Sequence, residues 1–186
     1  MRNSGALIAK VAIALCLLLL ATSCSSAKVL QVDPGKVLGC GEIKRIHSSQ
    51  GLIFPCLDGK SKLRFTALRG PLIVNVWGSW CAACKDELPF LLSFNAKSEG
   101  RVQMLGVDVE EAKAADGKAF IIKSGMSWPS VIDPDGRSRG YFGMGVPVTW
   151  FIDSKGVVKF KKIGAIASEK ELRELAKKYL QVAIRK

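Results

Sequence analysis

Two cysteines separated by two residues, Cys81 and Cys84, constrain this chain more than any other feature. Thiols at that spacing can close a small disulfide and reopen it by exchange with the thiols of another protein. The near-continuous apolar run before them, residues 71–77, is typical of a buried parallel strand. Gly78-Ser79 then breaks the strand, and a helix-like stretch begins just after Cys81. We therefore expect Cys81 to stand at the N-terminus of a helix.

The position of Cys81 favours redox chemistry over metal binding. Unpaired backbone N–H groups and the positive end of the helix dipole stabilise a thiolate, which is the attacking species in disulfide exchange. A zinc site would need a second pair of ligands at matching spacing. The only histidine is His47, and Cys24, Cys40 and Cys56 form no second close pair. We expect no metal and no cofactor.

The first two dozen residues have the pattern of an export signal. Arg2 and Lys10 are the only charges before an apolar stretch, residues 11–21, that is too short to span a bilayer comfortably. Small residues follow and end in Cys24, as in a bacterial lipobox, where the cysteine is lipidated and becomes the new N-terminus. We expect the folded domain to lie outside the cytoplasm, anchored by lipid to the bacterial cell membrane.

Two alternatives remain at this end of the chain. Ala21 stands where a lipobox usually has leucine, so ordinary signal cleavage could release a soluble, secreted protein instead. An uncleaved membrane anchor is a further alternative. We divide the chain into a signal peptide at residues 1–23, a tether at residues 24–38 that carries Pro34-Gly35, and one domain at residues 39–186.

Composition supports one globular domain with a sizeable core, because the 186 residues are 48% hydrophobic and 24% charged. Removal of residues 1–23 takes away two basic residues and no acidic ones, and lowers the formal net charge from +12 to +10. The lysines and arginines are spread along the whole chain and not gathered in blocks, and the protein is expected to be exported, so we expect no nucleic-acid partner. A basic surface of this kind suits anionic lipid headgroups.

The other two cysteines of the expected domain, Cys40 and Cys56, flank a polar segment. In an oxidising compartment they most simply pair as a structural disulfide. Closing a loop of that size contributes about 3 kcal/mol to stability in the chain-entropy model. The alternative is a second redox pair that relays electrons to Cys81 and Cys84, and the sequence contains no motif for it.

Hydrophobic periodicity predicts alternating strands and helices, followed by a hairpin and a last helix. The expected strands are an N-terminal hairpin within residues 40–65 and strands at 71–77, 102–109, 130–132, 148–152 and 157–163. The expected helices are 82–97 with a kink at Pro89, 112–123 with Ala115, Ala119 and Ile122 on its apolar side, and one opened by the capping box Ser168-Glu169-Lys170-Glu171. Together they predict an α/β domain with a mixed central sheet covered on both faces.

Three motifs resemble the TlpA/ResA-like class of thioredoxin-fold proteins, which are exported thiol-disulfide oxidoreductases. The first runs from Asn75 to Pro89 and combines tryptophan, the two cysteines and a Glu-x-Pro. The second is Gly145-Val146-Pro147-Val148-Thr149, which matches a loop whose proline is cis and faces the active cysteines. The third is a strand-helix unit at about residues 107–132 that this class inserts into the thioredoxin scaffold. The resemblance covers residues 39–182.

The resemblance implies a role for several motif residues. Cys81 corresponds to the nucleophile, which attacks a partner disulfide, and Cys84 to the cysteine that resolves the mixed disulfide. Glu87 corresponds to a glutamate below the cysteines that handles the proton of Cys84. The alternative for Glu87 is a surface acid favoured by the helix dipole. Asn75 stands where thioredoxins carry a buried acid, which leaves Glu87 as the only nearby group for proton transfer.

Trp80, Val146 and Pro147 are expected to bind the partner. Proline lacks an N–H and fixes its own φ, so the loop leaves neighbouring backbone free to pair with a bound peptide. The alternative for Pro147 is a trans turn proline. Of the two tryptophans beside the cysteines, Trp77 and Trp80, we expect one in the core and one at the rim, with Trp80 helping to seat the partner.

The implied function is disulfide exchange with cysteine-containing exported proteins, in the direction of reduction and including apocytochrome c before haem attachment. A membrane redox partner, CcdA/DsbD-like or VKOR-like, is expected. The alternative is a DsbE/DsbF-like oxidant, although Ala82 and Ala83 bring no charge and so favour a less oxidising centre.

Two other classes are distant alternatives. A peroxiredoxin-type peroxidase needs a threonine or serine three residues before its cysteine, whereas Ser79 stands two residues before Cys81. A Sco-like copper-binding protein needs a CxxxC and a histidine far downstream, whereas this chain has CxxC and the single upstream His47. The sequence therefore favours disulfide exchange over both.

Overall fold

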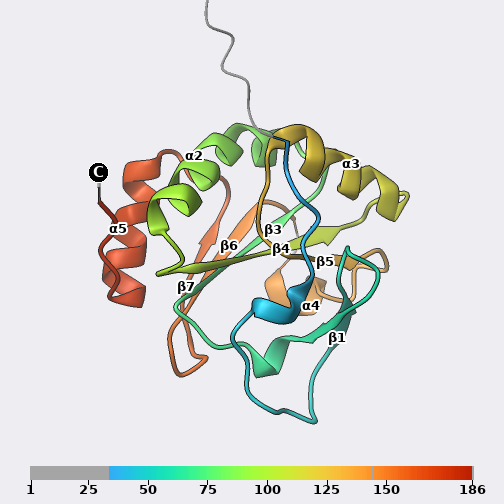
Figure 1. Ribbon diagram of the computed structural model, residues 1–186, viewed down its shortest axis with the longest axis horizontal. Coiled ribbons are helices and arrows are strands. Elements are labelled where there is room, and N and C mark those ends of the chain that lie inside the picture. Colours follow the sequence, from blue (N-terminus) through green and yellow to red (C-terminus); the bar gives the residue numbers. More distant parts are fainter. Residues whose placement is uncertain (1–33, 144, 186) are drawn as a thin grey trace, which may run out of the picture. The chain divides into compact units, whose positions relative to one another are not determined.

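Five strands form the central sheet of the protein, in the order β5-β4-β3-β6-β7 (Figure 1). The structure is a computed structural model that describes residues 34–143 and 145–185. The predicted signal peptide, Cys24 and most of the predicted tether lie outside the described residues. β3 pairs parallel with β4 and β4 with β5, whereas β6 runs antiparallel to both β3 and β7. The strands are Leu72–Trp77 (β3), Gln103–Val109 (β4), Ser130–Asp133 (β5), Val148–Ile152 (β6) and Val158–Ile163 (β7).

The central strand β3 is buried on both faces, because its side chains alternate between two hydrophobic cores. Ile73 and Trp77 belong to one core. Leu72, Val74 and Val76 belong to the other. A strand buried in this way has no polar face, which explains its near-continuous apolar sequence.

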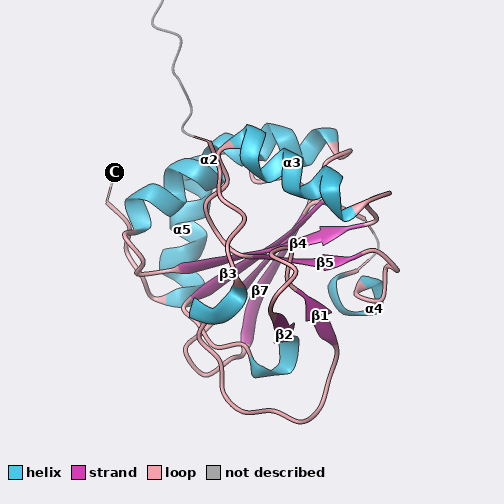
Figure 2. Ribbon diagram, turned by 45° about the vertical axis from the view of Figure 1, so that its right-hand side comes forward, coloured by secondary structure: helices cyan, strands magenta, loops and turns pink. Residues whose placement is uncertain are grey.

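The three longer helices cover one face of the sheet, and shorter elements cover the other (Figures 1 and 2). The longer helices are α2 (Ala82–Ser98), α3 (Ala114–Ser124) and α5 (Glu169–Leu180). The opposite layer consists of the hairpin β1 (Ile53–Pro55) and β2 (Lys62–Arg64), the 3-10 helices η1 (Cys40–Glu42) and η2 (Phe65–Ala67), and the short helix α4 (Arg139–Phe142). The predicted α/β class is confirmed, and α4 was not predicted. No helix within residues 34–143 and 145–185 is long and apolar enough to cross a membrane.

The buried face of α3 differs from the predicted one. Ala115 and Ala119 are exposed, and Ile122 is 48% exposed. Gly117 and Ile121 face the core instead. Glycine adds no apolar side chain to a sequence pattern, so a helix that approaches the sheet through a glycine shows its buried side poorly. The predicted apolar side was therefore wrong for this helix.

A disulfide joins Cys40 to Cys56 within the layer that contains the hairpin. Both cysteines are fully buried. Cys56 also forms a β-bridge with Val131 of β5, and the backbone N–H of Leu57 donates to the carbonyl oxygen of Ser130 at 2.8 Å. The disulfide therefore fastens the start of the described chain to the edge of the central sheet.

The last residues of the predicted tether pack against the domain. The N–H of Gly35 donates to the carbonyl oxygen of Ile122 at 2.9 Å, and that of Lys36 donates to Met126 at 2.8 Å. A Cβ on Gly35 would lie 2.0 Å from a backbone oxygen of α3, so only glycine fits this approach. Val37 packs against the core under the long helices. The folded part thus extends several residues before residue 39.

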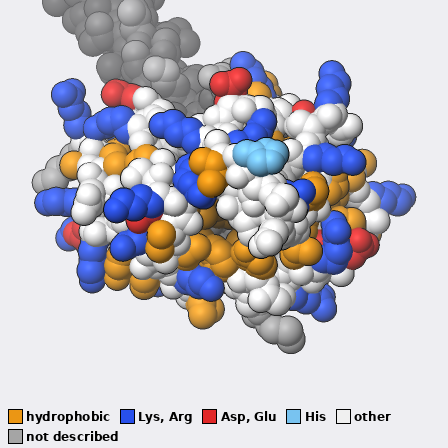
Figure 3. Space-filling view, turned by 90° about the horizontal axis from the view of Figure 1, so that it is seen from below, with side chains coloured by type: hydrophobic (Ala, Val, Ile, Leu, Met, Phe, Trp, Pro, Cys, Tyr) orange, Lys and Arg blue, Asp and Glu red, His pale blue; other side chains and the backbone are white. Residues whose placement is uncertain are grey.

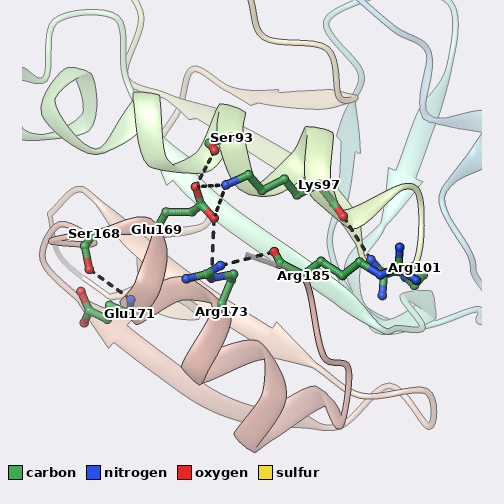
Figure 4. A network of polar contacts seen from close by, with 8 residues as sticks. All are labelled: Ser93, Lys97, Arg101, Ser168, Glu169, Glu171, Arg173 and Arg185. Atoms are coloured by element: carbon green, nitrogen blue, oxygen red, sulfur yellow. Dashed lines mark hydrogen bonds and ion pairs between the residues drawn. The ribbon is translucent and has the colours of Figure 1, made fainter.

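A polar network fastens α5 to α2 (Figure 4). The carboxylate of Glu169 accepts hydrogen bonds from Ser93 Oγ at 2.5 Å and Lys97 Nζ at 2.9 Å. These bonds hold the pKa of Glu169 below its usual value, so the group stays charged. Arg173 Nε lies 3.6 Å from the same carboxylate. The network fixes the start of α5, and Ile166, three residues before that helix begins, reaches the site described below.

The predicted capping box at the start of α5 is present. Ser168 is the N-cap, and its Oγ accepts the N–H of Glu171 at 3.1 Å. The Glu171 side chain in turn accepts the N–H of Ala167 at 2.7 Å. The first bond satisfies one first-turn N–H that the helix leaves unpaired, and the second ties the Glu171 side chain to the residue just before the N-cap.

We expect the Cys40–Cys56 disulfide to stabilise the fold without taking part in exchange. Replacing both cysteines by alanine should lower the free energy of unfolding by about 3 kcal/mol, because the bridge closes a loop of this length. Denaturant unfolding measures that loss, and the rate of exchange at Cys81–Cys84 should stay unchanged. Opening of Cys40–Cys56 by electrons from Cys81–Cys84 would contradict this prediction.

Candidate active site

The active-site turn connects the end of β3 to the start of α2. After Trp77 the chain turns at Gly78, whose carbonyl oxygen accepts the N–H of Cys81 at 3.1 Å. Cys81 is the N-cap of α2, with extended backbone angles, and its Sγ accepts the N–H of Cys84 at 3.0 Å. A sulfur atom thus occupies the place where serine or aspartate usually caps a helix. The structure places Cys81 at the helix start that the sequence predicted.

Cys81 and Cys84 form a disulfide, with a Cα–Cα distance of 5.3 Å. Both are buried, at 5% and 4% exposed, even though Cys81 stands at the start of the helix. Neighbouring apolar side chains cover the bridge, since both cysteines belong to the core that contains Trp77. Exposure therefore does not distinguish the two sulfurs in this form. Their positions do, because Cys81 lies outside the helix and Cys84 lies in its first turn.

Glu87 is buried below the cysteines and is not a surface acid. It is 1% exposed, and both carboxylate oxygens accept hydrogen bonds at 2.8 Å, one from Asn75 Nδ2 and one from the N–H of Ile166. Burial raises the pKa of Glu87, and the two hydrogen bonds partly oppose that shift. Among the described residues no hydrogen bond joins Glu87 to Cys84, which lies one turn earlier on the same helix.

Thr149 completes the polar cluster around Glu87, and sequence reasoning gave it no role. Asn75 Nδ2 also donates to Thr149 Oγ1 at 3.2 Å, across the pair formed by β3 and β6. Thr149 is fully buried. The only feature of the sequence that could have pointed to Thr149 is its place in the loop motif, two residues after Pro147. The cluster links the helix that carries the cysteines to that loop.

The two tryptophans divide as expected into one core and one rim residue. Trp77 is buried and packs on Phe120, with ring centroids 5.3 Å apart. Trp80 is 51% exposed, and its Nε1 donates to the carbonyl oxygen of Val109 at 3.3 Å. The exposed indole lies directly before Cys81 and is available to a partner.

A cavity of about 250 Å³ opens beside Trp80. Its walls come from the ends of β3 and β4, from α4 and from the loop before β6. Val146 lines it and also packs against the core that contains both active cysteines. The peptide bond between Val146 and Pro147 is cis, as the resemblance implied. A second cis bond, Gly70–Pro71, was not predicted.

Two patterns of charged and metal-binding side chains can be read from the described structure. Within residues 34–143 and 145–185, no group of three or more histidine, cysteine, aspartate or glutamate side chains could hold a metal ion. Figure 3 shows lysine and arginine side chains dispersed over the lower face, with apolar patches between them.

The fold and this site define a thioredoxin-like thiol-disulfide oxidoreductase. A five-stranded mixed sheet presents a Cys-x-x-Cys disulfide at the start of a helix, beside a cis-proline loop. The chain belongs to the AhpC/TSA family, whose family model matches residues 49–161.

Relatives and solved structures agree with this class. The chain is 35% identical over 127 residues to the thiol:disulfide interchange protein DsbE of Pseudomonas fluorescens biotype C, covering 67% of this chain and 70% of that protein. It is 32% identical over 116 residues to the thiol-disulfide oxidoreductase ResA of Bacillus anthracis, covering 61% and 66%. The structure of MTB dsbF matches with a TM-score of 0.57 and 25% identity, covering 65% and 89%. A secreted thiol-disulfide isomerase from Corynebacterium glutamicum matches with a TM-score of 0.60 at 17% identity, covering 79% and 98%, and so shows the fold alone. The chain is thus an oxidoreductase of the ResA/DsbE type.

We predict that Cys81 is alkylated well before Cys84 when the reduced protein meets iodoacetamide near neutral pH. Cys81 caps α2 from outside the helix, whereas Cys84 is enclosed in the first turn. Peptide mapping by mass spectrometry after short labelling times measures the two rates. Equal labelling of both thiols in the folded protein would contradict the distinction.

Proposed function

We propose that this protein reduces disulfides in cysteine-containing exported proteins, with Cys81 as nucleophile and Cys84 as resolving cysteine. The observation that carries the proposal is the Cys81–Cys84 disulfide at the start of α2. The names of the relatives, interchange protein and thiol-disulfide oxidoreductase, support the same reaction.

The reaction proceeds by two exchanges. The Cys81 thiolate attacks one sulfur of the partner disulfide, so that a mixed disulfide forms and one partner thiolate leaves. The Cys84 thiol loses its proton and attacks Cys81 Sγ, which forms the Cys81–Cys84 disulfide and releases the second partner thiolate. Two electrons pass from this protein to the partner, and each partner sulfur takes up a proton.

Glu87 is the proposed acceptor of the Cys84 proton. Cys84 lies in apolar surroundings, where desolvation raises the pKa of a thiol. Glu87 lies three residues further along the same helix, and its own raised pKa makes it a stronger base than an exposed glutamate. Asn75 cannot accept a proton at neutral pH, and its hydrogen bond orients the carboxylate instead.

The partner peptide is proposed to bind across Trp80, Val146 and Pro147. Trp80 is an exposed aromatic next to the nucleophile, and Val146 lines the adjoining cavity. Pro147 has no N–H, so the neighbouring backbone stays free to pair with an extended peptide. The cavity would accept an apolar side chain near the partner cysteine.

The redox potential of the Cys81–Cys84 pair tests the proposed direction of electron flow, from this protein to its partner. Ala82 and Ala83 add no positive charge that would stabilise the Cys81 thiolate, and a less stable thiolate favours the disulfide form. A potential close to the value of about −270 mV for thioredoxin would support a reductant. A value near the roughly −120 mV of DsbA would instead show an oxidant that introduces disulfides.

The proposed cellular setting rests on the sequence before the domain. We propose a signal peptide at residues 1–23, lipidation of Cys24 and attachment to the outer face of the cell membrane, with a CcdA/DsbD-like or VKOR-like protein as electron donor. Apocytochrome c is the proposed substrate by analogy with the TlpA/ResA-like class. Mass spectrometry of the mature N-terminus tests the anchor: diacylglycerol on Cys24 would support it, and an unmodified terminus in the medium would contradict it.

Replacing Glu87 with glutamine should slow release of the partner from the mixed disulfide, while the first attack by Cys81 changes little. Glutamine keeps the shape of the side chain but cannot take the Cys84 proton. Asn75 and the Ile166 N–H each donate to one oxygen of Glu87. The NH₂ group of glutamine would face one of these donors, so one hydrogen bond would be lost, at a cost of about 1 kcal/mol in the free energy of unfolding. Stopped-flow exchange with a fluorescent peptide disulfide, at several pH values, separates the two steps.

The matched control for that variant is Asp86→Asn. Asp86 is the preceding residue on α2 and is exposed, so its neutralisation should leave both steps close to wild type. A wild-type pH profile for Glu87→Gln would contradict the proposed role and leave water as the proton acceptor.

A further inference from the structure

A second buried carboxyl group lies on the other side of the active-site turn, and the proposed reaction does not use it. Asp108 is fully buried near the end of β4, where it stands opposite Trp77 of β3. Neither of its oxygens accepts a hydrogen bond from any described residue. A buried, unpaired carboxylate is costly, so its surroundings require an explanation.

The groups that face Asp108 are acidic or uncharged. Glu111 follows β4, Asp116 comes from the first turn of α3, and Gly117 packs so closely that a Cβ there would lie 1.9 Å from Asp108 Oδ2. Burial, then the charges of Glu111 and Asp116, raise the pKa of Asp108 to about 9. No ion pair of the described residues includes Asp108 or Glu111. At neutral pH Asp108 therefore carries its proton, which it can donate to the Glu111 carboxylate.

Glu111 connects this carboxyl pair to the active-site turn. Its Oε1 accepts the backbone N–H of Ser79 at 2.5 Å, and its Oε2 accepts the Ser79 hydroxyl at 2.9 Å. Ser79 lies two residues before Cys81. The Trp80 indole adds a second attachment of the same turn to the end of β4, through the carbonyl oxygen of Val109. The turn that carries Cys81 is therefore held by α2 on one side and, through Ser79, by Glu111 on the other.

We propose that Glu111, through its two hydrogen bonds from Ser79, is a positioning residue for Cys81, and that its negative charge destabilises the Cys81 thiolate. The proposal rests on disulfide exchange at Cys81. A charged carboxylate bonded to Ser79 keeps that residue's N–H and hydroxyl away from the sulfur and repels negative charge on it. Both effects favour the disulfide over the dithiol, and so strengthen the protein as a reductant.

Asp108 keeps this arrangement free of a second negative charge. Its pKa in the folded state lies above the unfolded value of about 3.9, so the folded protein binds the extra proton across the interval between them. Stability contributed by that proton is complete at low pH and falls as the pH rises towards 9. An asparagine at this position would keep an N–H donor for Glu111 and remove the dependence on pH.

The test compares the variant Glu111→Gln with the wild-type protein in glutathione redox buffers. Removing the charge should shift the Cys81–Cys84 equilibrium towards the dithiol by about tenfold, or about 30 mV less negative, and should move the alkylation profile of Cys81 to lower pH. Glu174→Gln, which removes the same charge from the exposed face of α5, should change neither. If Glu111→Gln unfolds, Ser79→Ala removes one of the two hydrogen bonds and should shift the equilibrium the same way by less.

Asp108→Asn provides the second arm, with the protein in its disulfide form. Relative to this variant, the wild-type melting temperature should fall steadily from pH 5 to pH 9. Two results would overturn the inference. One is a redox equilibrium of Glu111→Gln equal to that of the wild-type protein. The other is a melting temperature that changes with pH in the same way in Asp108→Asn and in the wild-type protein. Absence of exchange in the wild-type protein itself would instead contradict the proposed function.

Discussion

The hydrogen bond from the Cys84 N–H to Cys81 Sγ determines where the reactive sulfur lies. It forms because β3 ends at Trp77, inside the core, and the chain must turn at once into α2. The turn leaves Cys81 as the helix cap and Cys84 one turn inside. Every other part of the site, from the cis-proline loop to the buried acids, is arranged around that placement.

Two carboxyl groups approach this turn from inside the fold. Glu87 lies below it with a raised pKa, bonded to Asn75 and Ile166. Glu111 lies beside it, bonded to Ser79. Negative charge near a thiol disfavours the thiolate, and a less stable thiolate makes the dithiol a stronger electron donor. The electrostatics of the site therefore agree with the proposed direction of electron flow.

The parts of the fold that follow from local pattern were predicted from the sequence, and those that depend on distant contacts were not. The β3 strand, the N-cap at Cys81 and the Ser168 capping box depend on neighbouring residues and are present. The buried face of α3 depends on how closely Gly117 meets the sheet, which no periodicity reveals. The hydrogen bonds that Ser79 donates to Glu111 join residues 32 positions apart, and the one that Asn75 donates to Thr149 joins residues 74 apart. Glu87 could be predicted as a site residue because it belongs to a recognised motif. Asp108 could not, because nothing in the sequence of its strand distinguishes it.

The most direct test of the account is to identify which sulfur joins a partner. A peptide carrying one activated disulfide should attach to Cys81 in the Cys84→Ser variant and stay attached, because the resolving thiol is missing. Tandem mass spectrometry of the trapped adduct locates the bond. The account predicts a stable adduct on Cys81, and little adduct on Cys84 in the matched Cys81→Ser variant. Faster or equal attachment to Cys84 would contradict it.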